Sequence, residues 1–228
     1  MSSFDTKKLF APDAGNLNKL EHVATIQYRH ELARKGIHLF SLSIPTIYYF
    51  ISKELALSIL VPLTAAFLFV DLARHFNPTI STWFYKWFGW LLRRHETDSK
   101  QKRLNGASHV LIAVSLSVLL FPKIIAINAI TVLIISDTTS ALIGRRFGRH
   151  RFFGKSLEGS TAFFVSAMIV ILVAPKIHYQ LSEYLVGFIA AFVGAIVEAL
   201  PIKIDDNLSI PLSVGFVMWG LYALLHLL

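Results

Sequence analysis

The stretch from Asp137 to Ser160 holds the residues of this chain that are best suited to chemistry. Asp137 follows a long, largely apolar run, and a carboxylate in such a place is costly in hydrocarbon, which makes it a candidate functional residue. The positions behind it are basic and punctuated by glycines, and they end in Gly154-Lys-Ser-Leu-Glu-Gly159. Bare backbone N–H groups and positive side chains suit a phosphate-rich ligand. The pattern predicts a phosphate site, with an ordinary basic loop as the alternative.

Two helical faces made of small residues each lead to a carboxylate. One face runs from Asp137 to Gly148 and the other from Gly187 to Glu198, with alanine or glycine at each helical repeat between. Packed together, such faces would present Asp137 and Glu198 to one site. Carboxylates combined with substrate phosphates are the usual surroundings of Mg²⁺. We therefore expect a divalent-cation site here, with a purely structural Glu198 as the alternative.

Two further polar clusters flank these faces in the sequence. Arg34 and His38 share a helical face, with Lys35 beside them, and the three side chains can hold phosphates at the membrane surface. A plain basic flank of a membrane span is the alternative. After Glu198, the pair Asp206-Asn207 is either part of the same site or a solvated turn.

The composition indicates a polytopic membrane protein. The 228 residues are 54% hydrophobic and 16% charged, and the mean hydropathy is +0.58. These values are too apolar for an ordinary soluble domain. The absence of cysteine excludes disulfides and cysteine-based metal or redox chemistry. In such a chain the net charge of +8 reflects topology and phosphate binding, so we expect no nucleic-acid partner.

The expected fold is all-α, with about seven transmembrane helices and one interfacial amphipathic helix. The apolar runs cover 36–52, 54–73, 107–122, 124–144, 160–175, 183–200 and 207–228. Between Pro78 and Arg94, tryptophans recur at helical spacing and arginines follow, which suits the headgroup boundary as an anchor or as a lateral gate for a lipid. Residues 1–35 would form a cytoplasmic N-terminal segment without a cleavable signal, and residues 36–228 a single membrane-embedded catalytic domain.

The basic residues set the expected orientation of the chain. With seven spans, 19 of the 22 lysine and arginine residues fall on one side, and only Lys53, Lys123 and Lys176 fall on the other. The positive-inside rule places the 19 in the cytoplasm. The N-terminus and all the polar clusters described above share that side, so we expect an integral membrane protein with a cytoplasmic active site.

Four motifs together resemble the CTP-dependent lipid kinases, the family of dolichol kinase, phytol and farnesol kinases and the CTP-dependent diacylglycerol kinase. They lie in order and at family-like spacing over about residues 31–220. The chain is shorter than the eukaryotic dolichol kinases and nearer in size to the bacterial and phytol-kinase-like members. The motifs are Arg34-Lys35-x-x-His38, Ser136-Asp-Thr-Thr-Ser-Ala-Leu-Ile-Gly-Arg-Arg-Phe-Gly148, Gly154-Lys-Ser-Leu-Glu-Gly-Ser160, and Glu198-Ala-Leu-Pro followed by Asp205-Asp-Asn-Leu-Ser-Ile-Pro211.

Together with the residue patterns above, the resemblance implies transfer of the terminal phosphate of CTP to a membrane lipid alcohol. An isoprenoid alcohol would be the first candidate and diacylglycerol the second. Catalysis would fall to Asp137, Glu198 and Lys155, and Mg²⁺ or another divalent cation to Asp137, Glu158 and Glu198. The CTP site would comprise Arg34, Lys35, His38, Gly144, Arg145, Gly148, Lys155, Ser156, Glu158, Gly159, Asp206 and Asn207.

Two other functions stay open at this stage. Phosphatidate cytidylyltransferase has a similar order of Asp, Gly, Lys and Glu-Gly, but its Ser-Pro-x-Lys-Thr is replaced here by Phe153-Gly-Lys-Ser-Leu157. A polytopic transporter would show inverted repeats and polar residues at mid-membrane, whereas the polar clusters here lie on one side. The small-residue faces can pack within one chain or between copies, which leaves a homo-oligomer open.

Overall fold

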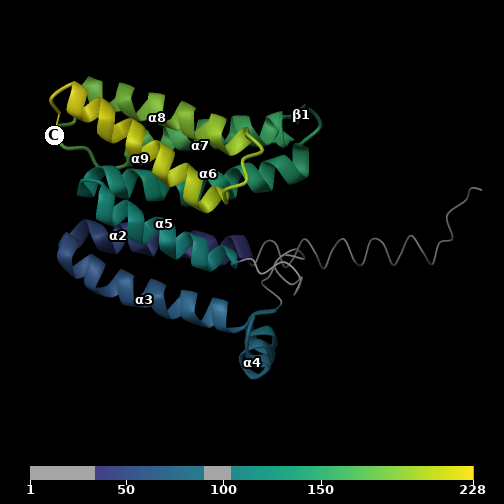
Figure 1. The fold of residues 1–228 in the computed structure, drawn as a ribbon. Helices are drawn as coiled ribbons and strands as arrows, with labels where there is room; N and C mark the ends of the chain where they lie inside the picture. The colour runs from purple at the N-terminus through teal and green to yellow at the C-terminus, as the bar shows by residue number, and fades with distance from the viewer. Residues whose placement is uncertain (1–33, 90–103, 228) are drawn as a thin grey trace, which may run out of the picture.

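The computed structural model of the protein describes residues 34–89 and 104–227. The regular secondary structure of this part of the chain is helical apart from one short hairpin (Figure 1). A helical stretch at 34–40 comes first. The elements that follow are α2 (Ser43–Phe50), α3 (Lys53–Ala73), α4 (Pro78–Phe88), α5 (Gly106–Leu120), α6 (Lys123–Phe147), β1 (Arg151–Phe152), β2 (Lys155–Ser156), α7 (Leu157–Val173), α8 (Leu181–Ala199) and α9 (Asp206–Leu224).

The structure supports an all-α membrane protein. It does not support the expected seven spans, because too few of the described helices are long enough to cross a membrane. Four described helices, α3, α6, α8 and α9, are long and apolar enough to cross a membrane. The helices α5 and α7 are apolar but have only 15 and 17 residues. The first apolar run is interrupted by a turn at 41–42, before α2. Ser41 donates its hydroxyl to the carbonyl of His38 at this turn, so the backbone polar groups there remain bonded outside a regular helix.

Helix α6 lies at the centre of the described bundle. It packs against α7 and α9 and also contacts α2 and α5. In Figure 1, α6–α9 form one half of the bundle and α2, α3 and α5 the other. Most of the middle of α6 is fully buried, including Ile130, Leu133 and Ile134. The buried hydrophobic side chains form one cluster drawn from α2, α3 and α5–α9, which fixes the relative positions of the helix ends.

Polar side chains determine where the site helices begin. Ser156 accepts a hydrogen bond from the N–H of Gly159 at 3.1 Å and so caps α7. Asp205 accepts one from the N–H of Asn207 at 3.0 Å and caps α9. Such N-caps satisfy backbone donors that a helix start otherwise leaves free. The caps place Lys155 just before α7 and Asp206 in the first turn of α9.

The predicted amphipathic helix exists over Pro78–Phe88. Phe84 is buried and lies under the guanidinium group of Arg74 at 4.6 Å, whereas Trp83 and Trp87 are exposed. Positions 90–94 lie outside the described residues, so their part in this helix stays a prediction, as does its place at the headgroup boundary. The predicted N-terminal segment 1–35 also lies almost wholly outside them.

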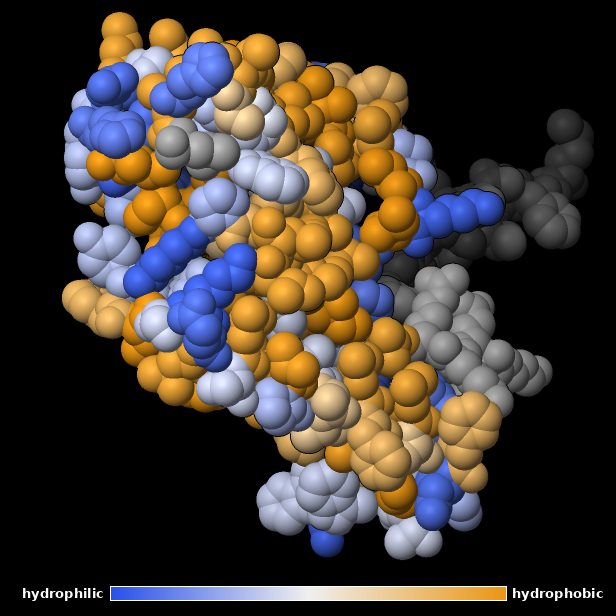
Figure 2. Space-filling view, turned by 60° about the vertical axis from the view of Figure 1, so that its left-hand side comes forward, coloured by the Kyte–Doolittle hydropathy of each residue, from blue (hydrophilic) through white to orange (hydrophobic). Residues whose placement is uncertain are grey.

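A large share of the surface is apolar, as the face shown in Figure 2 illustrates. On α3 alone, Ile59, Phe67 and Phe69 are exposed. Contiguous apolar surface of this extent is unsuited to water and is typical of helices that face lipid.

Candidate active site

One pocket of about 330 Å³ collects ten of the fourteen residues that the sequence analysis singled out. Four segments contribute: the helical stretch 34–40, the C-terminal half of α6, the hairpin with the start of α7, and the junction of α8 and α9. The lining consists of Arg34, Lys35, Asp137, Ser140, Ala141, Gly144, Arg145, Lys155, Ser156, Gly159, Glu198 and Asp206.

A buried ion pair ties the first segment to α6. The Nζ atom of Lys35 lies 2.6 Å from Oδ2 of Asp137 and also donates to the Asp137 carbonyl oxygen at 3.3 Å. Lys35 is 5% exposed and the Asp137 side chain 16%. The Nε2 atom of His38 lies 3.7 Å from the same carboxylate oxygen. Burial of a carboxylate is tolerated here because cationic side chains surround it.

Glu198 is the most deeply buried carboxylate of the pocket, at 1% exposure. Its Oε1 atom accepts hydrogen bonds from Ser140 Oγ and Lys155 Nζ, both at 2.7 Å. Its Oε2 atom accepts one from Ser160 Oγ at 3.2 Å. The three donors come from α6, β2 and α7, so the carboxylate joins three segments of the site.

Lys155 bridges two carboxylates across the pocket. Its Nζ atom lies 2.7 Å from Oε1 of Glu198 and 2.9 Å from Oδ2 of Asp206. Burial alone would lower the pKa of the Lys155 amine, but the Asp206 and Glu198 carboxylates more than offset burial and raise this pKa above its ordinary value. The amine is therefore a permanent positive charge at neutral pH, aimed into the pocket.

Glycines let α6 and α7 approach closely at this point. A Cβ atom on Gly144 would lie 2.9 Å from Ser156 Oγ and 3.3 Å from the Cα of Gly159. A Cβ on Gly159 would lie 3.2 Å from the Cα of Gly144 and from the Ser140 carbonyl oxygen. Gly148 packs on the Ser156 side chain rather than lining the pocket, since its Cβ would meet Ser156 Cβ at 2.9 Å. The small-residue face predicted on α6 is thus a helix contact and a pocket wall at once.

Four predicted site residues do not line the pocket: His38, Gly148, Glu158 and Asn207. The Glu158 carboxylate instead accepts a hydrogen bond from Nδ1 of His150 at 2.8 Å. Asn207 donates its side-chain amide to Oδ1 of Asp205 at 2.7 Å. His38 remains within 3.7 Å of Asp137, at the pocket's edge. Roles for these four residues in binding CTP or metal stay predictions.

Ser140 and Ser160 were missed by the sequence analysis. Ser140 lies one turn after Asp137 in a mostly apolar helix, which was an available signal. Ser160 closes a predicted motif, but serine is common in such helices, and its role appears only when α8 brings Glu198 alongside. No group of three or more acidic or histidine side chains lies close enough to hold a metal ion within 34–89 and 104–227.

The pocket combines four cationic side chains with three carboxylates at the end of candidate membrane spans. Cations of this kind neutralise the oxygens of a polyphosphate, and a carboxylate can orient or deprotonate a hydroxyl group. The arrangement is therefore suited to a reaction between a phosphorylated, water-soluble molecule and a molecule held in the bilayer.

Comparison with known proteins adds relatives at three levels of similarity. No family model and no solved structure matches the chain. The chain is 33% identical over 192 residues to the uncharacterized protein RP860 of Rickettsia prowazekii, covering 83% of this chain and 93% of the relative. It is 29% identical over 192 residues to the uncharacterized protein MJ1137 of Methanocaldococcus jannaschii, covering 82% and 92%. It is 27% identical over 209 residues to CTP-dependent diacylglycerol kinase 1 of Schizosaccharomyces pombe, covering 84% and 93%.

The similarity to RP860 extends over nearly the whole of that protein, and the similarity to the fission yeast enzyme is more distant but equally extensive. The chain therefore belongs to the family of the Rickettsia prowazekii protein RP860, and its distant similarity to CTP-dependent diacylglycerol kinase 1 supports a place among the CTP-dependent lipid kinases.

Proposed function

We propose that the protein transfers the terminal phosphate of CTP to the hydroxyl group of a membrane lipid, giving CDP and a lipid monophosphate. The observation that carries this proposal is the pocket, in which basic side chains and carboxylates meet at the end of the candidate spans. A donor from water and an acceptor from the bilayer can both reach such a place. The name of the fission yeast relative supplies the nucleotide.

The cations of the pocket would bind the phosphates of CTP. Arg34 and Arg145 line the pocket from two segments, and Lys155 projects from β2. Arginine suits paired phosphate oxygens, and lysine contributes a compact charge. Because Glu198 and Asp206 fix Lys155, its charge would already be in position as charge builds up on the transferred phosphoryl group.

Asp137 is the proposed carboxylate for the attacking hydroxyl group. It lines the pocket and is held by Lys35, so its oxygens have a defined direction. It would accept the hydrogen bond of the lipid hydroxyl and orient the oxygen in line with the terminal phosphate. Replacement of Asp137 by asparagine preserves the shape of the side chain but removes its charge.

A divalent cation would bind in the mode typical of Mg²⁺, which uses one or two carboxylates together with substrate phosphates and water. Asp137 and Asp206 would hold it, because their side chains are 16% and 38% exposed and face the same pocket. Glu198 is buried and already accepts three hydrogen bonds, and Glu158 does not line the pocket. When bound, the ion would neutralise charge on the phosphates.

We propose diacylglycerol as the first candidate acceptor and an isoprenoid alcohol as the second. The sequence motifs alone favoured the reverse order, since dolichol and phytol kinases share them. The fission yeast relative is named for diacylglycerol, which supports the change.

We further propose that α7 crosses the membrane with the four longer helices and that the pocket faces the cytoplasm. Asn128, near the start of α6, donates its side-chain amide to the carbonyl of Pro175, just after α7, at 3.0 Å. Helix α7 therefore returns along the length of α6. If α6 spans the bilayer, the two ends of α7 lie on opposite sides, although α7 is short.

The direct test supplies purified protein with CTP labelled at its terminal phosphate, Mg²⁺, and diacylglycerol, phytol or a polyprenol in parallel. Label should enter diacylglycerol, and Asp137→Asn should abolish this transfer while leaving the protein folded in detergent. Label released as pyrophosphate, with phosphatidate present, would instead identify a cytidylyltransferase. Intact CTP with every lipid would overturn the kinase proposal.

A further inference from the structure

The connection between α6 and α7 carries an exposed surface that is both basic and aromatic. From 145 to 154 the chain contains four arginines, three phenylalanines and no acidic residue, and every position is exposed. We call Arg149, Arg151, Phe152 and Phe153 the hairpin tip. Phe152 and Phe153 form an edge-to-face pair with ring centroids 4.8 Å apart, and Phe153 is 67% exposed.

The backbone at Phe153 disfavours the side chain that it carries. Phe153 is the first of the two residues that connect β1 to β2, and its φ is 49°. Glycine, asparagine and aspartate are the usual residues at such left-handed turn positions, and a bulky residue there is an outlier. Because the turn itself does not favour phenylalanine, its presence there points to an interaction made by the ring.

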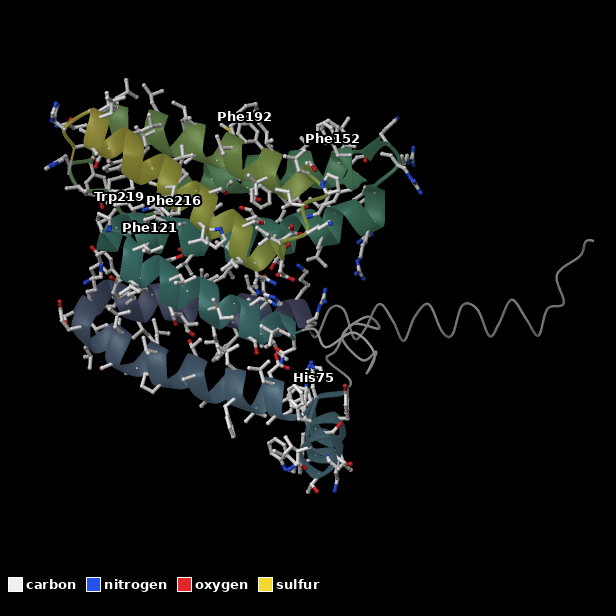
Figure 3. All side chains as sticks on the ribbon, in the orientation of Figure 1. His75, Phe121, Phe152, Phe192, Phe216 and Trp219 are labelled. Atoms are coloured by element: carbon white, nitrogen blue, oxygen red, sulfur yellow. The ribbon has the colours of Figure 1, made fainter. Side chains whose placement is uncertain are left out.

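The hairpin tip lies where an interface aromatic would be expected. In Figure 3, Phe152 lies at one end of the bundle, along the same edge as Phe192 of the candidate span α8, whose side chain is 55% exposed. Beyond the other end of α7, Tyr179 is also exposed and also has a positive φ, of 58°. A helix of 17 residues is about 25 Å long, close to the thickness of the hydrocarbon core. Aromatic residues at both ends of an apolar helix are typical of the two bilayer interfaces.

We propose that the hairpin tip inserts into the headgroup region of the bilayer and binds anionic phospholipids. Phe152 and Phe153 would lie at the boundary with the acyl chains, and Arg149 and Arg151 would contact lipid phosphates. Lys155 and Ser156 follow at once in β2, so anchoring the tip sets the pocket at the depth of the lipid headgroups. This inference does not depend on the proposed kinase activity.

The first test measures the depth of the tip directly. Because the chain has no cysteine, Phe153→Cys can carry a single bimane fluorophore in vesicles. We expect quenching by brominated acyl chains and little quenching by iodide in water. The matched control is Lys203→Cys, an exposed position in the loop between α8 and α9, which should be quenched by iodide. A fluorophore at 153 that behaves like the one at 203 would overturn the proposal.

The second test measures lipid preference at the tip itself. Quenching of bimane on Phe153→Cys is compared in brominated phosphatidylglycerol and in brominated phosphatidylcholine, with both arginines present and in R149Q/R151Q. The protein with both arginines should favour phosphatidylglycerol, and each arginine lost should weaken that preference by about five-fold. An equal preference in both proteins would contradict the role of the arginines.

A third variant separates lipid binding from nucleotide binding at the tip. Phe153→Asn suits the left-handed backbone better than phenylalanine, so the folded protein should be at least as stable. It should nevertheless lose membrane insertion, which is measured with bimane on Arg151→Cys in the same chain. A rise in the KM for CTP, with insertion unchanged, would assign the ring to the nucleotide instead.

Discussion

At the scale of single residues, the site depends on one lysine held between two carboxylates. Glu198 is buried, whereas Asp206 is more exposed, so the pair fixes the Lys155 amine at the boundary between the protein interior and the pocket. A lysine in solution loses rotamer freedom when it binds phosphate. Because Lys155 is already fixed, its side chain loses less rotamer freedom when CTP binds.

Replacing Glu198 by glutamine should weaken CTP binding and change its pH dependence. Loss of one charge-assisted hydrogen bond should raise the KM for CTP by about ten-fold. The two carboxylates raise the Lys155 pKa against the effect of burial, so removing one of them lowers this pKa. The amine then loses its proton at lower pH, and the alkaline limb of kcat/KM for CTP should move to lower pH.

The control for this change is Ser160→Ala. It removes a hydrogen bond to the same carboxylate but leaves both charges beside Lys155. Its alkaline limb should stay where it is in the unmodified protein. A limb that moves equally in both variants would mean that packing around Glu198, and not its charge, controls Lys155.

Most charged residues of the site could be predicted from sequence, because a charge in an apolar chain is conspicuous. Arg34, Lys35, Asp137 and Lys155 all line the pocket. The sequence could not reveal which of these groups pair, since no spacing in the chain indicates that Glu198 accepts hydrogen bonds from Ser140, Ser160 and Lys155. Pairing depends on how α8 approaches α6 and α7. The positions of Ser140 and Ser160 in the sequence do not indicate that approach.

At the scale of elements, the crossing of α6 and α7 decides the shape of the pocket. Gly159→Ala should disturb it, because the new Cβ would lie 3.2 Å from two backbone atoms of α6 that cannot rotate away. We expect a loss of about 1–3 kcal/mol in stability and a marked fall in turnover. Thermal unfolding in detergent and the CTP assay would measure these effects.

The matched control is Gly220→Ala in α9. Nothing lies within 4 Å of its Cβ position, and alanine favours a helix over glycine by about 1 kcal/mol. This variant should be active and no less stable than the unmodified protein. Equal damage from both substitutions would show that the close contact at Gly159 has no special importance.

Three lysines hold helix ends at the opposite end of the bundle. Lys53 donates to the carbonyl of Leu119, Lys123 to that of Ile51, and Lys176 to that of Ala174. Lysine near a helix C-terminus satisfies carbonyl groups that lack a partner within the helix and complements the helix dipole. These three are the lysines that the sequence places on the side away from the basic loops.

Lys176→Met should destabilise the fold without altering the site. Lys176 is 4% exposed and donates to both Ile171 and Ala174 at the end of α7. Loss of these bonds should cost about 1–3 kcal/mol, measured by unfolding in detergent, with an unchanged KM for CTP in the folded fraction. Lys203→Met, at an exposed position, serves as control and should have no effect on stability.

The positions of the helices followed from the apolar runs, but the number of helices long enough to span a membrane did not. All seven runs contain helix, since apolar stretches bounded by prolines and polar residues are a strong signal. Helices α5 and α7 begin at Gly106 and Leu157, just before the starts of their apolar runs, and end before Pro122 and Pro175. Both are about as short as the runs themselves, below the length of an ordinary span. The two-residue strands β1 and β2 gave no periodic signal, because a period of two needs more than two residues to show.

At the scale of the whole molecule, charge and helix direction point to one orientation. The basic residues gather at the end of the bundle that holds the pocket, whereas Lys53, Lys123 and Lys176 at the other end are engaged with helix carbonyls. This arrangement supports a pocket that faces the cytoplasm. Length alone cannot decide whether α7 crosses the bilayer, but its two ends can be located separately.

Single cysteines placed at the two ends of α7 would test the orientation, because the chain has no cysteine of its own. Arg149 lies before α7 and Tyr179 after it, and both are exposed. In sealed cells, a membrane-impermeant maleimide should label Tyr179→Cys from outside, whereas Arg149→Cys should react only after the cells are opened. If α6 spans the membrane, the bond between Asn128 and Pro175 requires the two positions to lie on opposite sides, despite the 17 residues of α7, and the positive-inside rule supplies the direction. Labelling of both positions from one side would mean that α6 and α7 do not cross the membrane, and a reversed pattern would place the pocket outside, away from cytoplasmic CTP.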